Sequence, residues 1–257
     1  MEHPVQKAIP ASTVVIFRDD ESGNGPPQLL MVRRAETMVF AAGAAVFPGG
    51  RIDLDDHYLA KIFAPDMDED EGAARIAGIR ETLEETGLAV GIEHVGDAAA
   101  LAYARSAVLE GAEFSGIIRE LGWELRPEQL IPFARWRPAH RLDRIFDTRF
   151  YLAHDPVAAA EVTVDASENS HAFWTSAQAM LDLADRKEGH IIYPTRRNLE
   201  RLALFGSFAE AVDHAQRHEI RAITPFFEER DGERHLCIDS DLGYPVTSES
   251  IHSMQRG

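Results

Sequence analysis

The chain has 257 residues, which is long enough to bury a substantial core in one elaborated domain. Its 26 Lys and Arg against 43 Asp and Glu give a formal net charge of −17, which argues against nonspecific binding to nucleic acid or to an anionic membrane. Cys237 is the only cysteine, so an internal disulfide is excluded, and no apolar run reaches the length of about 18 residues that a membrane span requires.

Two β-rich runs, residues 12–17 and 28–32, are the first predicted elements. The segment between them, residues 19–27, is rich in Asp, Gly and Pro, so the two runs are expected to form a β-hairpin. Arg33 and Arg34 follow the second run. In a continuing strand their side chains would point to opposite faces, so one could contact a phosphate while the other faces solvent.

Residues 73–85 are predicted to form one helix that carries three glutamates on one face. Glu81, Glu84 and Glu85 stand at i, i+3 and i+4, and like charges at these spacings destabilise a helix by about 0.2 to 0.5 kcal/mol per pair. A hard divalent cation with oxygen ligands, Mg²⁺ or Mn²⁺, would reverse this cost. The alternative is a solvated helix face, which is the commoner role of clustered glutamates.

Neighbouring residues favour the metal site over the solvated face. Pro48, Gly49 and Gly50 form a turn in which the missing Cβ atoms let the backbone approach a ligand or metal closely. Gly87 stands where the residue after a helix turns left-handed. Arg80 adds a fixed positive charge beside the acidic face and could hold a carboxylate with two hydrogen bonds.

Together these residues resemble the Nudix box, which is a glycine, five residues, an acid, seven residues and then Arg-Glu-U-x-Glu-Glu-x-Gly-U, where U is a bulky aliphatic residue. Gly50 aligns with the box glycine and Asp56 with its first acid, where the family usually has Glu. The segment 80–88 matches the second half, except that Thr82 replaces an aliphatic residue. The distance between the two halves is longer than in the pattern, and residues 57–72 hold the additional length.

This insertion, residues 57–72, is predicted to be a short helix followed by a loop. An apolar group at residues 58, 59, 62 and 63 precedes an acidic run, residues 66–71. The acids at 68–71 suit the positive N-terminus of the next helix. Because the metal ligands need only the glycine turn and the helix, the insertion is expected to form a lid or rim outside the metal site.

A second resemblance concerns the branch of the family. Residues 30–35, Gly43 and the turn at 47–50 resemble the signature before the box in Nudix coenzyme A diphosphatases, in which an Arg stands where this chain has Val39. A similarity to the branch that contains peroxisomal acyl-coenzyme A diphosphatases is stronger. It rests on the insertion, on the segments 135–138 and 144–151, and on Pro194-Thr195.

The resemblance implies the Nudix α/β/α sandwich, with a mixed sheet and additional helices. It implies a single domain over residues 1–257, with the insertion at about 57–72 and helical elaborations at about 97–121 and 176–218. It also implies metal-dependent hydrolysis of the diphosphate bond in a nucleoside diphosphate derivative. Glu81, Glu84, Glu85 and the main-chain carbonyl of Gly49 would then be the ligands of Mg²⁺ or Mn²⁺.

Catalytic candidates are Arg80, Glu81 and Glu84 in the box and Glu168 on a later loop, where it could take the proton of the attacking water or be only a solvated acid. The candidates for substrate binding are Arg33, Arg34, Gly50, Phe146 and Arg149. Phe146 could stack on a base, with core packing as the alternative.

The remaining predicted elements follow in chain order. Helices are expected at 97–109 and 111–121, divided by Gly111, then strands at 130–136 and 145–153 and a strand that ends at Phe173-Trp174. Helices follow at 176–185, 195–205 and 207–218. Cys237 lies in a predicted strand, where packing is favoured over a role as a catalytic thiol.

Coenzyme A and acyl-coenzyme A are the first candidate substrates, with ADP-ribose or NADH as alternatives. A nucleotide-sensing Nudix module without turnover is a further alternative, which the three clustered acids disfavour. The partner is expected to be a small molecule rather than nucleic acid or a membrane, and the oligomeric state is open, with a homodimer as one option. The start of the chain has no secretory signal, which predicts a cytoplasmic location.

Overall fold

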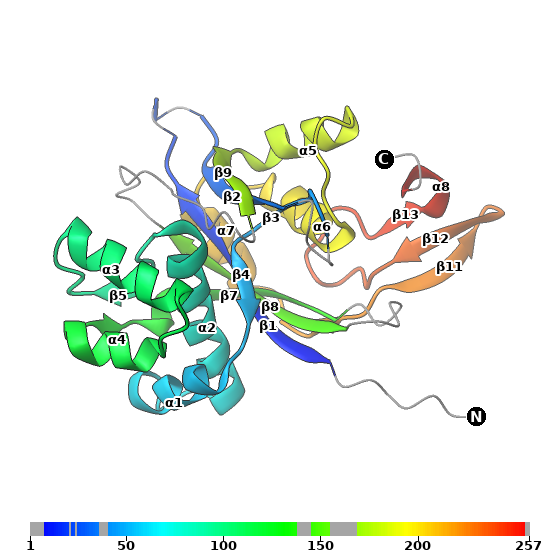
Figure 1. The fold of residues 1–257 in the computed structure, drawn as a ribbon. Helices are drawn as coiled ribbons and strands as arrows, with labels where there is room; N and C mark the ends of the chain where they lie inside the picture. Colours follow the sequence, from blue (N-terminus) through cyan, green and yellow to red (C-terminus); the bar gives the residue numbers. More distant parts are fainter. Residues whose placement is uncertain are drawn as a thin grey trace.

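The computed structural model describes residues 8–20, 22–23, 25–35, 41–137, 145–154 and 169–254. Its main feature is an eight-stranded mixed sheet with the order β10-β7-β8-β1-β2-β3, in which β4 also pairs with β1 and β9 with β2 (Figure 1). Strands β1 and β8 are parallel, as are β7 and β10, and the other pairs are antiparallel. The strands are β1 (Ile9–Arg18), β2 (Gln28–Arg34), β3 (Ala45–Val46), β4 (Gly49–Arg51), β7 (Ile131–Trp136), β8 (Phe146–His154), β9 (Asn169–Thr175) and β10 (Ala222–Ile223).

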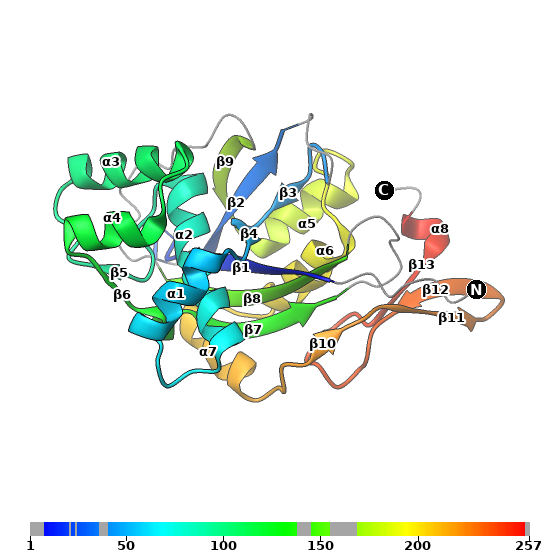
Figure 2. The same ribbon diagram turned by 60° about the horizontal axis from the view of Figure 1, so that its bottom comes forward.

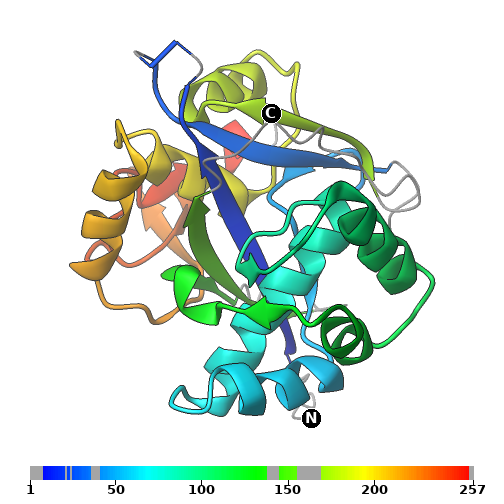
Figure 3. The same ribbon diagram turned by 90° about the vertical axis from the view of Figure 1, so that its left-hand side faces the viewer.

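Helices cover both faces of this sheet, so β1 is buried on both sides and is a continuous apolar run rather than an alternating one. Val14 and Ile16 point into one core, and Val15 and Phe17 point into the other. The first core contains α1 (Leu54–Phe63), α2 (Glu69–Thr86), α3 (Ala98–Leu109) and α4 (Phe114–Leu121), and the second contains α5 (Ala177–Asp185), α6 (Tyr193–Leu202) and α7 (Phe208–Gln216). Figure 3 shows the sheet between the two groups of helices, which confirms the predicted α/β/α sandwich.

The predicted hairpin is confirmed by the antiparallel pairing of β1 with β2. The predicted helices from residue 97 onwards are also present, each within a few residues of the expected bounds. Three of them begin at side-chain caps, because Asp97, Ser176 and Ser207 each accept a hydrogen bond from a backbone N–H of the first turn. Gly111 adopts a left-handed φ of 89° between α3 and α4.

Helix α2 begins four residues earlier than predicted. Asp68 caps it by accepting hydrogen bonds from the N–H groups of Asp70 and Glu71, and the negative charges of the first turn suit the helix N-terminus. At the other end Gly87 has the predicted left-handed conformation, with φ 75°. Gly78 lets the middle of α2 lie close to β1, because a Cβ there would come within 2.8 Å of the Ser12 hydroxyl.

The insertion, residues 57–72, contains most of α1 and the loop that leads to α2, in agreement with the predicted helix and loop, and also the first turn of α2. Leu59 and Ala60 are buried in the first core, where α1 packs against α2. The prediction of a lid or rim is therefore wrong for Leu59 and Ala60, because their side chains belong to the core. Tyr58 and Ile62 are exposed on the outer side of α1.

The C-terminal region contains the strand that was predicted around Cys237, and around it further structure that the sequence patterns did not predict. Strands β11 (Phe226–Arg230), β12 (Glu233–Cys237) and β13 (Ser248–Ser250) form a separate antiparallel sheet, which extends away from the main sheet in Figure 2, and α8 (Ile251–Met254) follows. A two-stranded sheet of β5 (Ile92–Glu93) and β6 (Glu124–Leu125), and the short helix η1 (Pro127–Gln129), were likewise not predicted. Cys237 is buried at the end of β12, as expected for a packing role.

In the described ranges, no helix combines the length and the apolar character that a membrane crossing requires.

Candidate metal centre

Two of the three glutamates of α2, Glu81 and Glu85, contact the glycine turn that leads into β4. The N–H of Gly49 donates a hydrogen bond of 2.9 Å to Oε2 of Glu85. The carboxyl group of Glu81 packs on Gly50, where an added Cβ would overlap it, and a Cβ on Gly49 would overlap the Ser12 carbonyl oxygen. Position 49 therefore requires glycine, and at Gly50 a Cβ would displace the Glu81 carboxyl group.

Arg80 connects these acids to the first acid of the box. Its Nε and Nη2 each donate a 3.0 Å hydrogen bond to the carboxylate of Asp56, which is the two-pronged pairing that the sequence predicted for an adjacent carboxylate. Its Nη1 donates to Glu81 at 2.9 Å and to Glu84 at 3.4 Å. Arg80 and Asp56 are both buried, so the alignment of Asp56 with the first box acid agrees with the contacts across the insertion.

The acidic face holds more negative charge than Arg80 balances. Burial raises the pKa of Glu81 to about 8, Glu84 and Glu85 add repulsion, and Arg80 opposes the rise. Burial also raises the pKa of Asp56, against the hydrogen bonds of Arg80. A divalent cation beside Glu81 would favour its ionised form and relieve this repulsion.

The donors fit Mg²⁺ or Mn²⁺, because they are all oxygen atoms and include charged carboxylates. Nη1 of Arg80 bonds both Glu81 and Glu84, and in the described residues the three carboxylates do not form a group whose ligand atoms all lie within 4.8 Å of one another. The carbonyl of Gly49 stays a predicted ligand.

A different group brings its ligand atoms closer together. The ligand atoms of Glu93, His94 and Glu124, on the β5–β6 sheet, all lie within 4.8 Å of one another. Arg126 already bonds both carboxylates, at 2.8 and 2.9 Å, so a cationic group is present there without a metal. These residues are partly or fully exposed, and the arrangement is a surface ion-pair cluster.

Two residues without a motif to mark them also contact the acidic helix. Asn169, at the start of β9, is fully buried and donates a hydrogen bond of 3.1 Å from Nδ2 to Oε1 of Glu85. Arg105, on α3, donates to the backbone carbonyls of Glu84 and Glu85, at 3.0 and 3.4 Å. Its charge thereby stabilises the carboxyl end of α2.

The predicted substrate-binding residues lie in different places. Arg34, half-buried, is opposite Asn169 in the β2–β9 pairing and so lies near the acidic helix, while Arg33 is exposed. Arg149 pairs instead with Glu71, 3.5 Å away, in the first turn of α2. Ten residues separate Glu71 from Glu81, which is about 15 Å along a helix.

Phe146 begins β8 and lies beside Ile9 in the sheet, half-buried. Its role in stacking on a base stays a prediction. The candidate base Glu168, together with Val39 and Arg144, lies outside the described residues.

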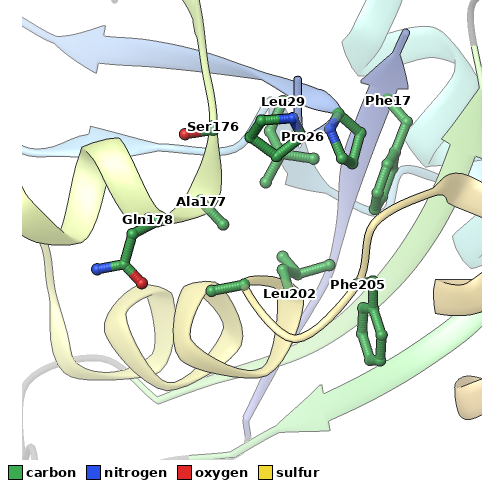
Figure 4. Close-up of a pocket in the computed structure, with 10 residues that line it drawn as sticks. Phe17, Pro26, Leu29, Ser176, Ala177, Gln178, Leu202 and Phe205 are labelled. Carbon is green, nitrogen blue, oxygen red and sulfur yellow. The ribbon is translucent and has the colours of Figure 1, made fainter. Parts of the chain in front are cut away.

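A small crevice lies on the other side of the sheet, between α5, α6 and the turn before β2 (Figure 4). It is lined mainly by apolar side chains, among them Phe17, Pro26, Leu29 and Leu202, and has a volume of about 30 Å³. This volume is that of about one water molecule, so the crevice is too small for a nucleotide.

Comparison with known proteins supports the resemblance seen in the sequence. No protein-family model and no curated protein matches the chain. Among solved structures, the crystal structure of a NUDIX hydrolase from Alicyclobacillus acidocaldarius has a TM-score of 0.72 and 27% sequence identity, covering 80% of this chain and 96% of that chain. A MutT NUDIX hydrolase from Burkholderia pseudomallei has a TM-score of 0.43 and 16% identity, covering 76% and 98%.

The protein is an α/β/α sandwich in which an acidic helix faces a glycine turn, and this arrangement is a candidate metal centre. The likeness to the Alicyclobacillus acidocaldarius structure supports a Nudix hydrolase.

Proposed function

We propose that the chain hydrolyses the diphosphate bond of a nucleoside diphosphate derivative and requires Mg²⁺ or Mn²⁺. The observation that carries the proposal is the contact of Glu81 and Glu85 with Gly50 and Gly49, with Glu84 joined to Glu81 through Arg80. Bound divalent ions neutralise the diphosphate oxygens and lower the pKa of a bound water, which is the chemistry that this reaction needs.

The residues of the chain have separate tasks in this proposal. Glu81, Glu84 and Glu85 hold the cation, with the Gly49 carbonyl as a further ligand. Arg80 orients Glu81 and Glu84 through the same guanidinium nitrogen and is itself anchored by Asp56. Glu84 is the most accessible of the three to a substrate, since its side chain is 29% exposed against 15% for Glu81.

The proton of the attacking water would go to a carboxylate beside the diphosphate. Glu81, Glu84 and Glu168 are the candidates for this base. Gly50 leaves room for the Glu81 carboxyl group at the turn, and Arg34, which is opposite Asn169 in the β2–β9 pairing, is the candidate for binding a phosphate of the substrate.

Coenzyme A and acyl-coenzyme A are the first substrates to test, in line with the sequence signature around the box, and ADP-ribose and NADH are the alternatives. The whole chain is proposed to act as one Nudix domain. A sensing module that binds a nucleotide without turnover has no need of three clustered acids, so hydrolysis is favoured.

A substrate panel with Mg²⁺, Mn²⁺ or a chelator tests the proposal. We expect metal-dependent release of a nucleoside monophosphate, or of 3′-phosphoadenosine phosphate and a phosphopantetheine product from coenzyme A. Quantifying AMP, phosphopantetheine and ribose phosphate identifies the bond that is cut. Nucleotide binding without product at either metal would favour the sensing module.

Glu85→Gln tests the metal ligand directly. The amide lacks the charge that holds a divalent ion, and we expect the rate to fall at least about a hundredfold, the scale seen when a principal charge-stabilising group is removed. Glu69→Gln is the matched control, because Glu69 is on the same helix but in its exposed first turn. Nearly unchanged turnover of Glu85→Gln at saturating Mg²⁺ would contradict the assignment.

A further inference from the structure

Asn169 contacts the acidic helix from a part of the chain far from the box. Its side chain is fully buried, and Nδ2 donates to Oε1 of Glu85 at 3.1 Å while the N–H of Gly49 donates to Oε2 at 2.9 Å. An ionised carboxylate only accepts hydrogen bonds, so the amide nitrogen of Asn169 must face it. Each oxygen of Glu85 therefore has its own donor.

The two donors come from different strands of one sheet. Gly49 is in β4, which pairs with β1, and Asn169 is in β9, which pairs with β2. Because β1 and β2 pair with each other, the distance between the two donors is set by the main sheet rather than by a loop. Glu85 is held between them and loses little further freedom when it binds a ligand.

A carboxylate that accepts hydrogen bonds can also bind a cation, because each of its oxygens carries two lone pairs. On the other end of the same amide, Oδ1 of Asn169 is buried and finds no hydrogen-bond partner within the described segments. Such an acceptor is uncommon in a folded protein and is expected where a further polar group binds.

We propose that Asn169 is a positioning residue, which holds Glu85 in the orientation that binds the divalent cation. The inference rests on the proposed function, since it takes Glu85 to be a metal ligand. Groups that hydrogen-bond a ligating carboxylate act through that carboxylate, and their removal typically weakens metal binding about 10- to 100-fold.

The test measures Mn²⁺ affinity by isothermal titration calorimetry, with the melting temperature of the metal-free protein as a check on folding. We expect Asn169→Ala to weaken Mn²⁺ binding about 10- to 100-fold. Asn169→Leu keeps the side-chain volume but cannot donate a hydrogen bond, and it should weaken Mn²⁺ binding to the same extent. This variant shows that the loss does not come from a cavity at position 169. Ser170→Ala is the matched control, because Ser170 is exposed and bonds the Arg33 carbonyl instead.

A double-mutant cycle with Glu85→Gln separates positioning from a general structural effect. If Asn169 acts through Glu85, Asn169→Ala should change Mn²⁺ affinity less than about twofold in the Glu85→Gln background. An equal loss in both backgrounds would overturn the inference.

The same cycle distinguishes the inference from the proposed function. If Glu85→Gln weakens Mn²⁺ binding while Asn169→Ala and Asn169→Leu behave like Ser170→Ala, the metal site stands and the positioning role is refuted. If Glu85→Gln leaves Mn²⁺ affinity unchanged, the metal site itself is refuted, and the positioning role with it.

Discussion

Thr82 is a fully buried residue of α2 whose hydroxyl has no hydrogen-bond partner among the residues described. It occupies the box position where the family pattern has an aliphatic residue. Four residues later Thr86 is also buried, but its hydroxyl donates to the Thr82 carbonyl at 2.6 Å and accepts from the N–H of Leu88 at 3.2 Å. The two buried threonines therefore differ mainly in that the Thr86 hydroxyl makes hydrogen bonds, whereas the Thr82 hydroxyl makes none among the residues described.

We predict that Thr82→Val raises the free energy of unfolding by about 1 kcal/mol, because an unsatisfied buried hydroxyl costs about 1 to 3 kcal/mol and the two side chains have similar shape. Thr86→Val, the matched control, should lower stability by about 1 to 3 kcal/mol because it breaks hydrogen bonds that are already made. Urea unfolding of the three proteins without metal measures both changes. A loss of stability in Thr82→Val would show that its hydroxyl has a partner in solution.

At the scale of single residues, the sequence predicted the candidate metal centre through local spacing. Glu81, Glu84, Glu85 and Arg80 follow from helical periodicity, and the glycine turn follows from the need for close backbone approach. Asn169 and Arg105 could not be found in this way, because they reach α2 through strand pairing and helix packing from distant parts of the chain. Arg149 was predicted to bind the substrate, but in the structure its side chain pairs with Glu71.

Helix α1 shows how an insertion becomes part of the core. Leu59 is 2% exposed and packs in the first core, whereas Tyr58 on the same helix is 55% exposed. Asp55 on α1 also accepts a hydrogen bond of 2.8 Å from the N–H of Ser115, at the start of α4. Helix α1 thereby connects the box to the helical elaboration.

Leu59→Ala should lower the free energy of unfolding by about 2 to 5 kcal/mol, the range for a large-to-small change in a core. Tyr58→Ala, one residue away, should stay within about 0.5 kcal/mol because its side chain is mainly in solvent. Chemical denaturation compares the two variants. Equal and small effects would restore the interpretation of α1 as a rim.

The elements that the sequence missed have a common physical cause. All five residues of β11 are exposed, so this strand shows no alternation of apolar and polar residues, and β5 and β6 are only two residues long. The first turn of α2 was missed because it is acidic and is fixed by the Asp68 cap rather than by apolar spacing. Long elements with a buried face were predicted reliably, because burial produces the period that a sequence displays.

At the scale of the whole molecule, three groups with shifted pKa values make stability depend on pH. Burial raises the pKa of Glu81 to about 8 and that of Glu200 to about 7, each from 4.5. Each folded-state carboxyl holds a proton that the unfolded chain has lost, so stability falls as pH rises through these ranges. Burial lowers the pKa of His214 from 6.5 to about 4, and this group makes stability rise with pH over that range.

Between pH 7 and 8 Glu81 contributes most of the change among these three groups, because Glu200 is already half ionised at pH 7 and His214 has completed its titration. We predict that the melting temperature of the metal-free protein falls across this interval and that Glu81→Gln removes most of the fall. Glu200→Gln should remove only a smaller part of it. Saturating Mg²⁺ should raise the melting temperature more at pH 8 than at pH 7, because the cation binds the ionised carboxylate that metal-free folding disfavours. Thermal scans at constant ionic strength measure the melting temperatures of the wild type, of the two variants and of the Mg²⁺-saturated protein. A fall that persists unchanged in Glu81→Gln would show that another group titrates. Glu81 would then not be the acid that the cation keeps ionised.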